Sequence, residues 1–542
     1  MTRDLARMER TQFDALVVGA GIYGLALAWE LTSRGASVAI VDRGDFGGAT
    51  TSNSLKTLHG GIRSLQHGAL GEMRRFVRER RALATIAPHL VRPLAFTIPT
   101  TRHPLHSKAA LGSFLTLYDL LTRDRNTNVA PTLRLPPSRI LSRAEARDVN
   151  PLVDQREVTG AAVWYDYQMR SSERVALAFL QTAVYAGACA ANYAEAGALL
   201  REGSRVVGAR VTDLVSGTTI DLRARAVINA AGPWAWSLLD RACVSTRLDR
   251  PGFSKAMNFV VRPVTTAYAV GGLARGRFVF IVPWREYSIA GTSHHPFTGS
   301  ADTLDLQCAE VRDFLDEVQT AFPGAALTAR DIRLVHRGLL PARPRAAAGH
   351  DELLKDSIVY AHQDDGTPGL FTVMGVRYTT ARETAERAAD RILPTILDRS
   401  AASRTVSTPL HGGDIVDIAA FERSAVAAAP GFNSPLVRRL VAQYGSSYGT
   451  VLKQCQADPR LAEPLGEDCP VTAGEILHAV RDEMAIHLSD AVLRRTDAAS
   501  AADPGRGPLE KAAAIMAPHL GWSEQTMRDE IADVERLFRL SL

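Results

Sequence analysis

The chain has 542 residues and a formal net charge of +5, from 63 basic and 58 acidic side chains. This length exceeds what one hydrophobic core supports, so we expect two or three domains, each able to exclude water from a site. The near-balanced charge argues against a nucleic-acid-binding protein. Five scattered cysteines without a Cys-x-x-Cys pair argue against a disulfide framework and a metal site, and favour the reducing cytoplasm.

The first residues, 1–13, lack the apolar core of a signal peptide. The next long apolar run is interrupted by glycines and by Glu30. We therefore expect neither a secretion signal nor a membrane-spanning segment.

A glycine-rich turn, GAGIYG, follows the apolar run FDALVV, which predicts a buried parallel strand. A small-residue helix comes next, and a second apolar run ends in Asp42, which completes the pattern of a dinucleotide-binding site. In that pattern Gly19 permits the tight turn, Gly21 lets a pyrophosphate approach the backbone, and Gly24 permits close packing of helix on strand. The Asp42 carboxylate would accept hydrogen bonds from ribose hydroxyls.

The glycine-rich turn alone does not distinguish FAD from NAD. Two later segments favour FAD. An apolar strand leads into Ala231 and Gly232, which are small enough for a dinucleotide to lie against their backbone. A second strand is followed by Gly375 and by a helix with Thr379 in its opening turn. Segments this far apart in the chain suit an extended FAD molecule better than a compact NAD site.

A polar stretch, TSNSLKTLHGGIRSL at 51–65, ends in His59, two glycines and Arg63. Its glycines allow backbone to approach a flat ligand without an intervening Cβ. The simpler interpretations are a surface histidine and a solvated arginine.

With these segments in place, the chain resembles the FAD-dependent, aerobic-type glycerol-3-phosphate dehydrogenases, which are members of the D-amino-acid-oxidase-like flavoprotein superfamily. The resemblance implies that Thr51, Ser52, Ser54 and Lys56 lie along FAD, and that His59 and Arg63 face the substrate. The match runs nearly end to end and is carried by the segments DALVVGAGIYGLALA, GDFGGATTSNSLKTLHGGIRSL, IAPHLVRPLAFTIP, VINAAGPW, FIVPWREYSIAGTS and AVRDEMAIHLSDAVLRRT.

The resemblance also implies the fold class: α/β, with a doubly wound, Rossmann-type FAD domain interleaved with an antiparallel-sheet substrate domain, and a helical C-terminal domain. We expect the FAD domain at 1–90, 155–240 and 346–400, the substrate domain at 91–154 and 241–345, and the helical domain at 405–542.

In the helical domain, Thr472 and Glu475 have capping-box spacing at the start of a predicted helix. Its apolar stripe is interpreted as core, with a subunit contact in a homodimer as the alternative. The stripe consists of Ile476, Val480, Met484, Leu488 and Val492.

The chain departs from the family's pattern where the resemblance puts the substrate. Ser64 stands where the family usually has tyrosine, and Leu340 stands where it has an arginine. Gly-Gly-Lys becomes Gly375, Val376 and Arg377, and Gly-Thr-Thr-Asp becomes Gly291, Thr292, Ser293 and His294. A phosphate needs several charge-assisted donors. Arg63 and Arg377 still supply positive charge. Arg337 or Arg343 is a candidate to replace the arginine that the family has at position 340.

We therefore predict an FAD-dependent dehydrogenase or oxidase that acts on a CH–OH donor, a small anionic and preferably phosphorylated substrate. His59 is our candidate base, and the hydride would pass to flavin N5. Quinone and oxygen both remain open as electron acceptors. The alternatives are glycerol-3-phosphate dehydrogenase itself, an amine or hydroxy-acid oxidase, and a non-enzymatic flavin-binding subunit.

The basic stretch MRRFVRERR at 73–81 would suit peripheral contact with the inner face of a membrane, although a solvated helix face is the preferred interpretation.

Overall fold

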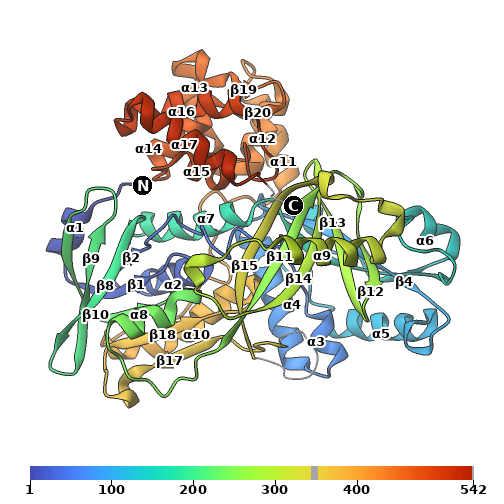
Figure 1. Cartoon of the computed structure of the whole chain (residues 1–542), viewed down its shortest axis with the longest axis horizontal. Helices are drawn as coiled ribbons and strands as arrows, with labels where there is room; N and C mark the ends of the chain where they lie inside the picture. Colours follow the sequence, from blue (N-terminus) through green and yellow to red (C-terminus); the bar gives the residue numbers. More distant parts are fainter. Residues whose placement is uncertain (344–351, 540–542) are drawn as a thin grey trace.

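The glycine-rich turn belongs to a mixed sheet with strand order β17-β18-β10-β1-β2-β7 within the described residues, 1–343 and 352–539, of this computed structural model (Figure 1). β17 pairs antiparallel with β18, the other neighbours in this order pair parallel, and β8 and β9 extend the start of β10 as an antiparallel hairpin. The strands are β1 (Phe13–Val18), β2 (Val38–Val41), β7 (Cys189–Ala191), β8 (Ala194–Glu202), β9 (Arg205–Asp213), β10 (Thr219–Asn229), β17 (Ile358–Ala361) and β18 (Leu370–Met374).

Both faces of this sheet are covered, which explains why its central strands β1 and β2 are mostly apolar. Ala15 and Val17 of β1 pack in one core with helices α2, α7 and α10, whereas Leu16 and Val18 pack in another with β8, β9 and α8. This arrangement confirms the predicted doubly wound α/β fold. The helices are α2 (Ile22–Ser33), α7 (Ser172–Tyr185), α8 (Ala235–Arg241) and α10 (Ala381–Ile392).

A second, mostly antiparallel sheet has the order β16-β15-β11-β14-β13-β12-β4-β6-β3, and β5 pairs with β6. Helix α9 (Cys308–Ala321) covers one face, where the Phe314 ring lies 4.6 Å from that of Phe259. The strands are β3 (Thr57–Leu58), β4 (Val91–Thr100), β5 (Arg139–Leu141), β6 (Gly160–Met169), β11 (Gly252–Val261), β12 (Tyr268–Ala274), β13 (Arg277–Trp284), β14 (Tyr287–Phe297), β15 (Ile332–Arg343) and β16 (Glu352–Leu353).

The division of the chain between the two sheets differs from the expected ranges at three strands. β3, β6 and β16 lie in the ranges expected for the FAD domain, yet all three belong to the antiparallel sheet. β6 pairs with β4 along its whole length, from Gly160 opposite Thr100 to Met169 opposite Val91. This long-range pairing leaves no local signal in the sequence. The expected boundary between 345 and 346 lies outside the described residues.

The basic stretch 73–81 lies in helix α4 (Leu70–Ile86), and each of its arginines pairs with a carboxylate. Arg74 and Arg81 both contact Asp124, while Arg75, Arg78 and Arg80 contact carboxylates on other elements. Because each positive charge is paired with a carboxylate, the stretch fits a solvated or packed helix face better than a lipid-binding one. Within residues 1–343 and 352–539, no helix has both the length and the apolar character that crossing a bilayer requires.

The C-terminal part is helical and lies over α7 in Figure 1. Its predicted helix from Thr472 begins with the expected capping box but ends at Asp482. Met484 has a positive φ of 55°, and the chain turns helical again only at Leu488. The elements are α11 (Ile418–Ala427), α12 (Ser434–Tyr444), α13 (Gly449–Ala457), β19 (Pro464–Gly466), β20 (Cys469–Thr472), α14 (Ala473–Asp482), α15 (Leu488–Asp490), a π-helical turn (Ala491–Arg495), α16 (Arg506–Leu520) and α17 (Glu524–Arg536).

The predicted stripe is mostly buried, in agreement with its interpretation as core. Ile476, Leu488 and Val492 lie in the core of the helical domain, whereas Met484 joins the core of the FAD sheet. The break in the helix thus lets one segment contribute to two cores.

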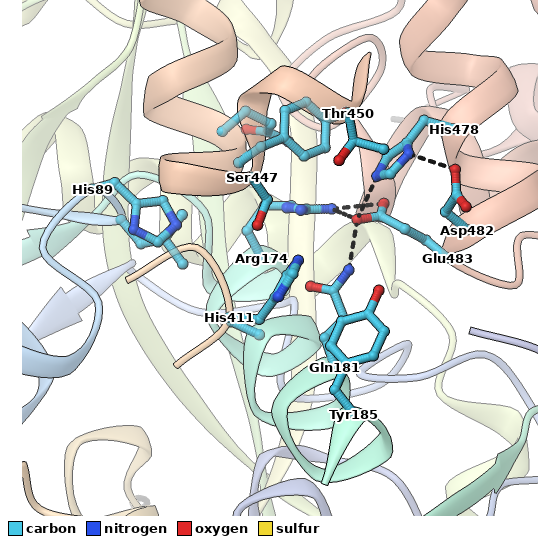
Figure 2. Close-up of a pocket in the computed structure, with 14 residues that line it drawn as sticks. His89, Arg174, Gln181, Tyr185, His411, Ser447, Thr450, His478, Asp482 and Glu483 are labelled. Carbon is cyan, nitrogen blue, oxygen red and sulfur yellow. Dashed lines mark hydrogen bonds and ion pairs between the residues drawn. The ribbon is translucent and has the colours of Figure 1, made fainter. Parts of the chain in front are cut away.

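Buried ionic contacts fix the helical domain to α7 (Figure 2). Arg174 of α7 lies 2.7 Å from Glu483, which also accepts a hydrogen bond of 3.0 Å from Gln181. Burial lowers the pKa of His478, but its contacts with Asp482 and Glu483 outweigh that effect and raise the pKa to about 9. The cavity of about 70 Å³ at this interface is far too small for a dinucleotide.

Candidate cofactor and substrate site

The glycine-rich turn has the geometry of a dinucleotide cradle. Gly19 has a φ of 104°, and a Cβ there would lie 2.6 Å from the carbonyl oxygen of Ala230. A Cβ on Gly24 would collide with the carbonyl of Gly19. At Gly21, the N-cap of α2, a Cβ would meet only the Thr51 hydroxyl, at 3.4 Å, and would otherwise project into free space. The turn therefore closes tightly against its own strands and leaves the helix N-terminus open to an anionic ligand.

A cavity of about 850 Å³ extends from this turn between the two sheets. That volume is near the upper end for small-molecule sites and suits an extended dinucleotide together with a small substrate. The sequence-predicted residues that line it are Gly19, Gly21, Asp42, Thr51, Ser54, Lys56, His59, Ala231, Gly232, Thr292, His294, Leu340, Gly375, Arg377 and Thr379.

Other predicted residues lie beside the cavity, outside its described lining. Gly24 packs beneath the turn, and the Ser52 hydroxyl donates to the carbonyl of Ala49. Ser64 is buried in the short helix α3 (Ile62–Gln66), which also carries Arg63. The backbone N–H of Arg337 donates to Asn53 Oδ1 at 3.2 Å.

The Asp42 carboxylate is held by backbone before any ligand binds. It accepts hydrogen bonds from the N–H groups of Ala20, at 2.6 Å, and Gly44, at 2.8 Å. Burial raises the pKa of Asp42 to about 6, although these two hydrogen bonds act in the opposite direction. Each oxygen keeps a lone pair that a ribose hydroxyl can use.

The Lys56 side chain lines the cavity, but its ammonium group stabilises its own loop and the neighbouring helix α7 through hydrogen bonds. It donates to the carbonyl of Ser52 at 2.6 Å, to Ser172 Oγ at 2.9 Å and to Glu173 Oε1 at 2.5 Å. Those three bonds use all the donors that an ammonium has. Burial lowers the pKa of Lys56, and the Glu173 carboxylate opposes that shift.

His59 lies above a buried ion pair that the sequence did not reveal. Its Nδ1 is 3.6 Å from Asp166 Oδ2, and its Nε2 is 2.9 Å from the Thr57 hydroxyl. The other oxygen, Asp166 Oδ1, accepts from the backbone N–H of Gly60 at 2.8 Å and from the Arg80 guanidinium. A Cβ on Gly60 would collide with Arg80, so only glycine fits between the histidine and the ion pair.

Asp166 and Arg80 were missed because neither belongs to a motif that we recognised in the sequence. Asp166 interrupts the apolar strand β6, and Arg80 belongs to a stretch that we interpreted as surface. An acidic residue within an otherwise apolar strand is the one feature that could have indicated a buried partner.

Three arginines interact electrostatically at one part of the site, and one of them, Arg377, lines the cavity. Arg377 pairs with Glu72, and its guanidinium lies 5.3 Å from the ring centroid of Phe76. Arg277, also missed from sequence, pairs with Glu317 and donates to the carbonyl of Thr292 at 2.8 Å. The pKa of Arg63 is lowered first by desolvation and then by the charges of Arg277 and Arg377, so the three guanidinium groups are electrostatically coupled. Such a group attracts an anion.

Comparisons with known proteins agree with this geometry. Residues 14–391 match the family model described as FAD dependent oxidoreductase, and residues 403–527 match the C-terminal domain of alpha-glycerophosphate oxidase.

Curated relatives include a glycerol-3-phosphate dehydrogenase from Mycobacterium leprae, 30% identical over 97% of this chain and 88% of that protein. A second, from Synechocystis, is 27% identical over 98% of this chain and 97% of that protein.

Among solved structures, the glycerol-3-phosphate dehydrogenase from Bacillus halodurans complexed with FAD has a TM-score of 0.75 and 23% identity, covering 98% of this chain and 96% of that one. At this identity the match supports the fold. The family matches confirm the resemblance seen in the sequence: the chain belongs to the FAD-dependent oxidoreductases and, among them, to the family of the glycerol-3-phosphate dehydrogenases.

Proposed function

We propose that the protein oxidises the secondary alcohol of a small, anionic, phosphorylated substrate, in a pocket that differs from that of its relatives. The observation that carries this proposal is that one cavity is lined by the dinucleotide turn, His59 and Arg377. Bound FAD supplies a hydride acceptor, flavin N5. The chain's own residues then have to bind the substrate, orient it and accept its hydroxyl proton.

His59 is the proposed base. The Asp166 carboxylate lies beyond hydrogen-bond distance of Nδ1, but near enough to favour the tautomer that carries the proton there. Nε2 is then the accepting nitrogen, and a substrate hydroxyl would replace Thr57 as its partner. Asp166 would act as a positioning residue, because it orients the imidazole without touching the substrate.

Arg377, Arg63 and Arg277 are the proposed partners of the anionic end. Each charge-assisted hydrogen bond to a phosphate contributes about 1.5–3 kcal/mol. Leu340 lines the cavity at the position where the family pattern has an arginine, so one such donor is replaced by an apolar side chain. This replacement supports an altered substrate preference.

The relatives' names supply the main alternative, glycerol-3-phosphate dehydrogenase activity without any change in substrate. A related structure is named an L-alpha-glycerophosphate oxidase, which keeps oxygen beside quinone as a candidate acceptor. Peripheral membrane contact and a homodimer stay proposals without a structural observation in their favour.

Anaerobic bleaching of the flavin by a substrate panel tests the proposal. The panel contains glycerol 3-phosphate, other phosphorylated secondary alcohols, unphosphorylated glycerol, 2-hydroxy acids and amino acids. We expect another phosphorylated alcohol to bleach faster than glycerol 3-phosphate, and glycerol to fail. Fastest bleaching by glycerol 3-phosphate would support the plain family activity, and bleaching only by amino acids would refute alcohol oxidation.

A further inference from the structure

A buried ionic cluster joins the helical domain to one end of the cofactor cavity. Asp45, in the loop after β2, is bound by two consecutive arginines of the π-helical turn. Arg494 Nε donates to Asp45 Oδ2 at 2.5 Å, and Arg495 donates to the two Asp45 oxygens at 2.7 and 2.6 Å. Because the loop also holds Asp42, the helical domain is attached to the same segment that forms one end of the cavity.

The two arginines have different surroundings. Arg495 has a side chain only 1% exposed, and its Nε donates to the carbonyl of Glu483 at 2.9 Å. Arg494 is 13% exposed and lines the cavity together with Asp42 and Tyr193. Arg495 therefore serves the domain contact, whereas Arg494 faces the ligand space.

Arg494 is held in place for a ligand contact. Its Nη2 donates to Asp490 Oδ1 at 2.5 Å, and Tyr193 donates to the same oxygen at 2.6 Å. The remaining nitrogen, Nη1, makes no hydrogen bond within the described part of the chain. A guanidinium fixed by two carboxylates loses little entropy when it donates to a hydroxyl or stacks on a flat base.

We propose that the helical domain completes the cofactor site, with Arg494 contacting the adenosine half of bound FAD. The assignment to that half follows from Asp42, which marks the ribose end of a dinucleotide site and lines the same part of the cavity. The proposal rests on FAD occupying the cavity and is independent of which substrate is oxidised. It gives the helical domain a role in retaining the cofactor.

The test is cofactor binding by the full-length protein. FAD is titrated into flavin-depleted protein and followed by flavin fluorescence, with ADP as a competitor that shares the adenosine half. Arg494→Gln is compared with Arg506→Gln, which changes a surface arginine, 63% exposed, of the same domain. We expect Arg494→Gln to raise the FAD dissociation constant about ten- to a hundredfold and the ADP inhibition constant by a similar factor, with no change in Arg506→Gln.

Unchanged FAD affinity in Arg494→Gln would overturn the proposal. So would weaker FAD binding with an unchanged ADP constant, because the lost contact would then lie outside the adenosine half. If Arg494→Gln does not fold, Arg494→Lys carries the same comparison, since it keeps the charge beside Asp45 and loses only the planar fork. No substrate is present in this assay, so failure of the proposed reaction leaves its outcome unaffected.

Discussion

The Asp166→Asn substitution separates the two roles that the structure gives to the ion pair beneath His59. Asp166 and Arg80 are each 1% exposed, so the substitution leaves a buried guanidinium without its counter-charge. Such a loss destabilises a protein by about 3–5 kcal/mol. Asparagine retains an oxygen for the Gly60 N–H. The substitution also removes the carboxylate near His59 Nδ1, and loss of an orienting partner of this kind lowers activity by roughly 10- to 100-fold.

Asp124→Asn is the matched control, because Asp124 pairs with Arg74 and Arg81 of the same helix but is 34% exposed. Exposed pairs contribute about 0–1 kcal/mol. The assays are thermal melting of the FAD-bound protein and anaerobic stopped-flow reduction of the flavin. We expect Asp166→Asn to melt several degrees below Asp124→Asn and to be reduced more slowly. Equal melting temperatures and equal reduction rates would refute the reasoning.

Four further outcomes are expected. Gly21→Val should yield protein without bound FAD, because the side chain enters the space of the pyrophosphate; retention of full FAD would contradict this site. His59→Ala should keep FAD but slow anaerobic flavin reduction by about 10²–10⁴-fold, and reduction at the parental rate would mean that another residue is the base. Leu340→Arg should raise activity on glycerol 3-phosphate by roughly ten- to a hundredfold, and no gain would argue that existing arginines already supply the missing donor. His478 has a pKa of about 9 in the folded protein against 6.5 as the ordinary value, so its stabilising effect is complete below pH 6.5 and is lost as the pH rises through 9. The melting temperature of the parent should therefore fall over that range more steeply than that of His478→Gln, and parallel profiles would contradict the assignment.

Sequence reasoning located cavity residues where the constraint is local, and it missed residues whose positions depend on long-range contacts. Gly19, Gly21 and Asp42 line the cavity because the spacing of a strand, a turn and a helix fixes their positions. Asp166 and Arg494 depend on a strand register and a domain contact that join residues far apart in the chain.

The helical domain also shows that sequence patterns do not reveal long-range packing. The four-residue repeat correctly predicted buried positions, but the repeat could not show that the helix breaks before Met484, or that this side chain belongs to another core. Periodicity reports which face is buried, and does not report against which element it packs.

A crystal structure of the protein with FAD and a phosphorylated, non-oxidisable substrate analogue tests the central claim most directly. We predict FAD in the cavity along the glycine-rich turn, the hydroxyl of the analogue within hydrogen-bond distance of His59 Nε2, and the phosphate against Arg377. FAD in place with the phosphate away from these arginines, or with no analogue hydroxyl near His59, would contradict the proposed site.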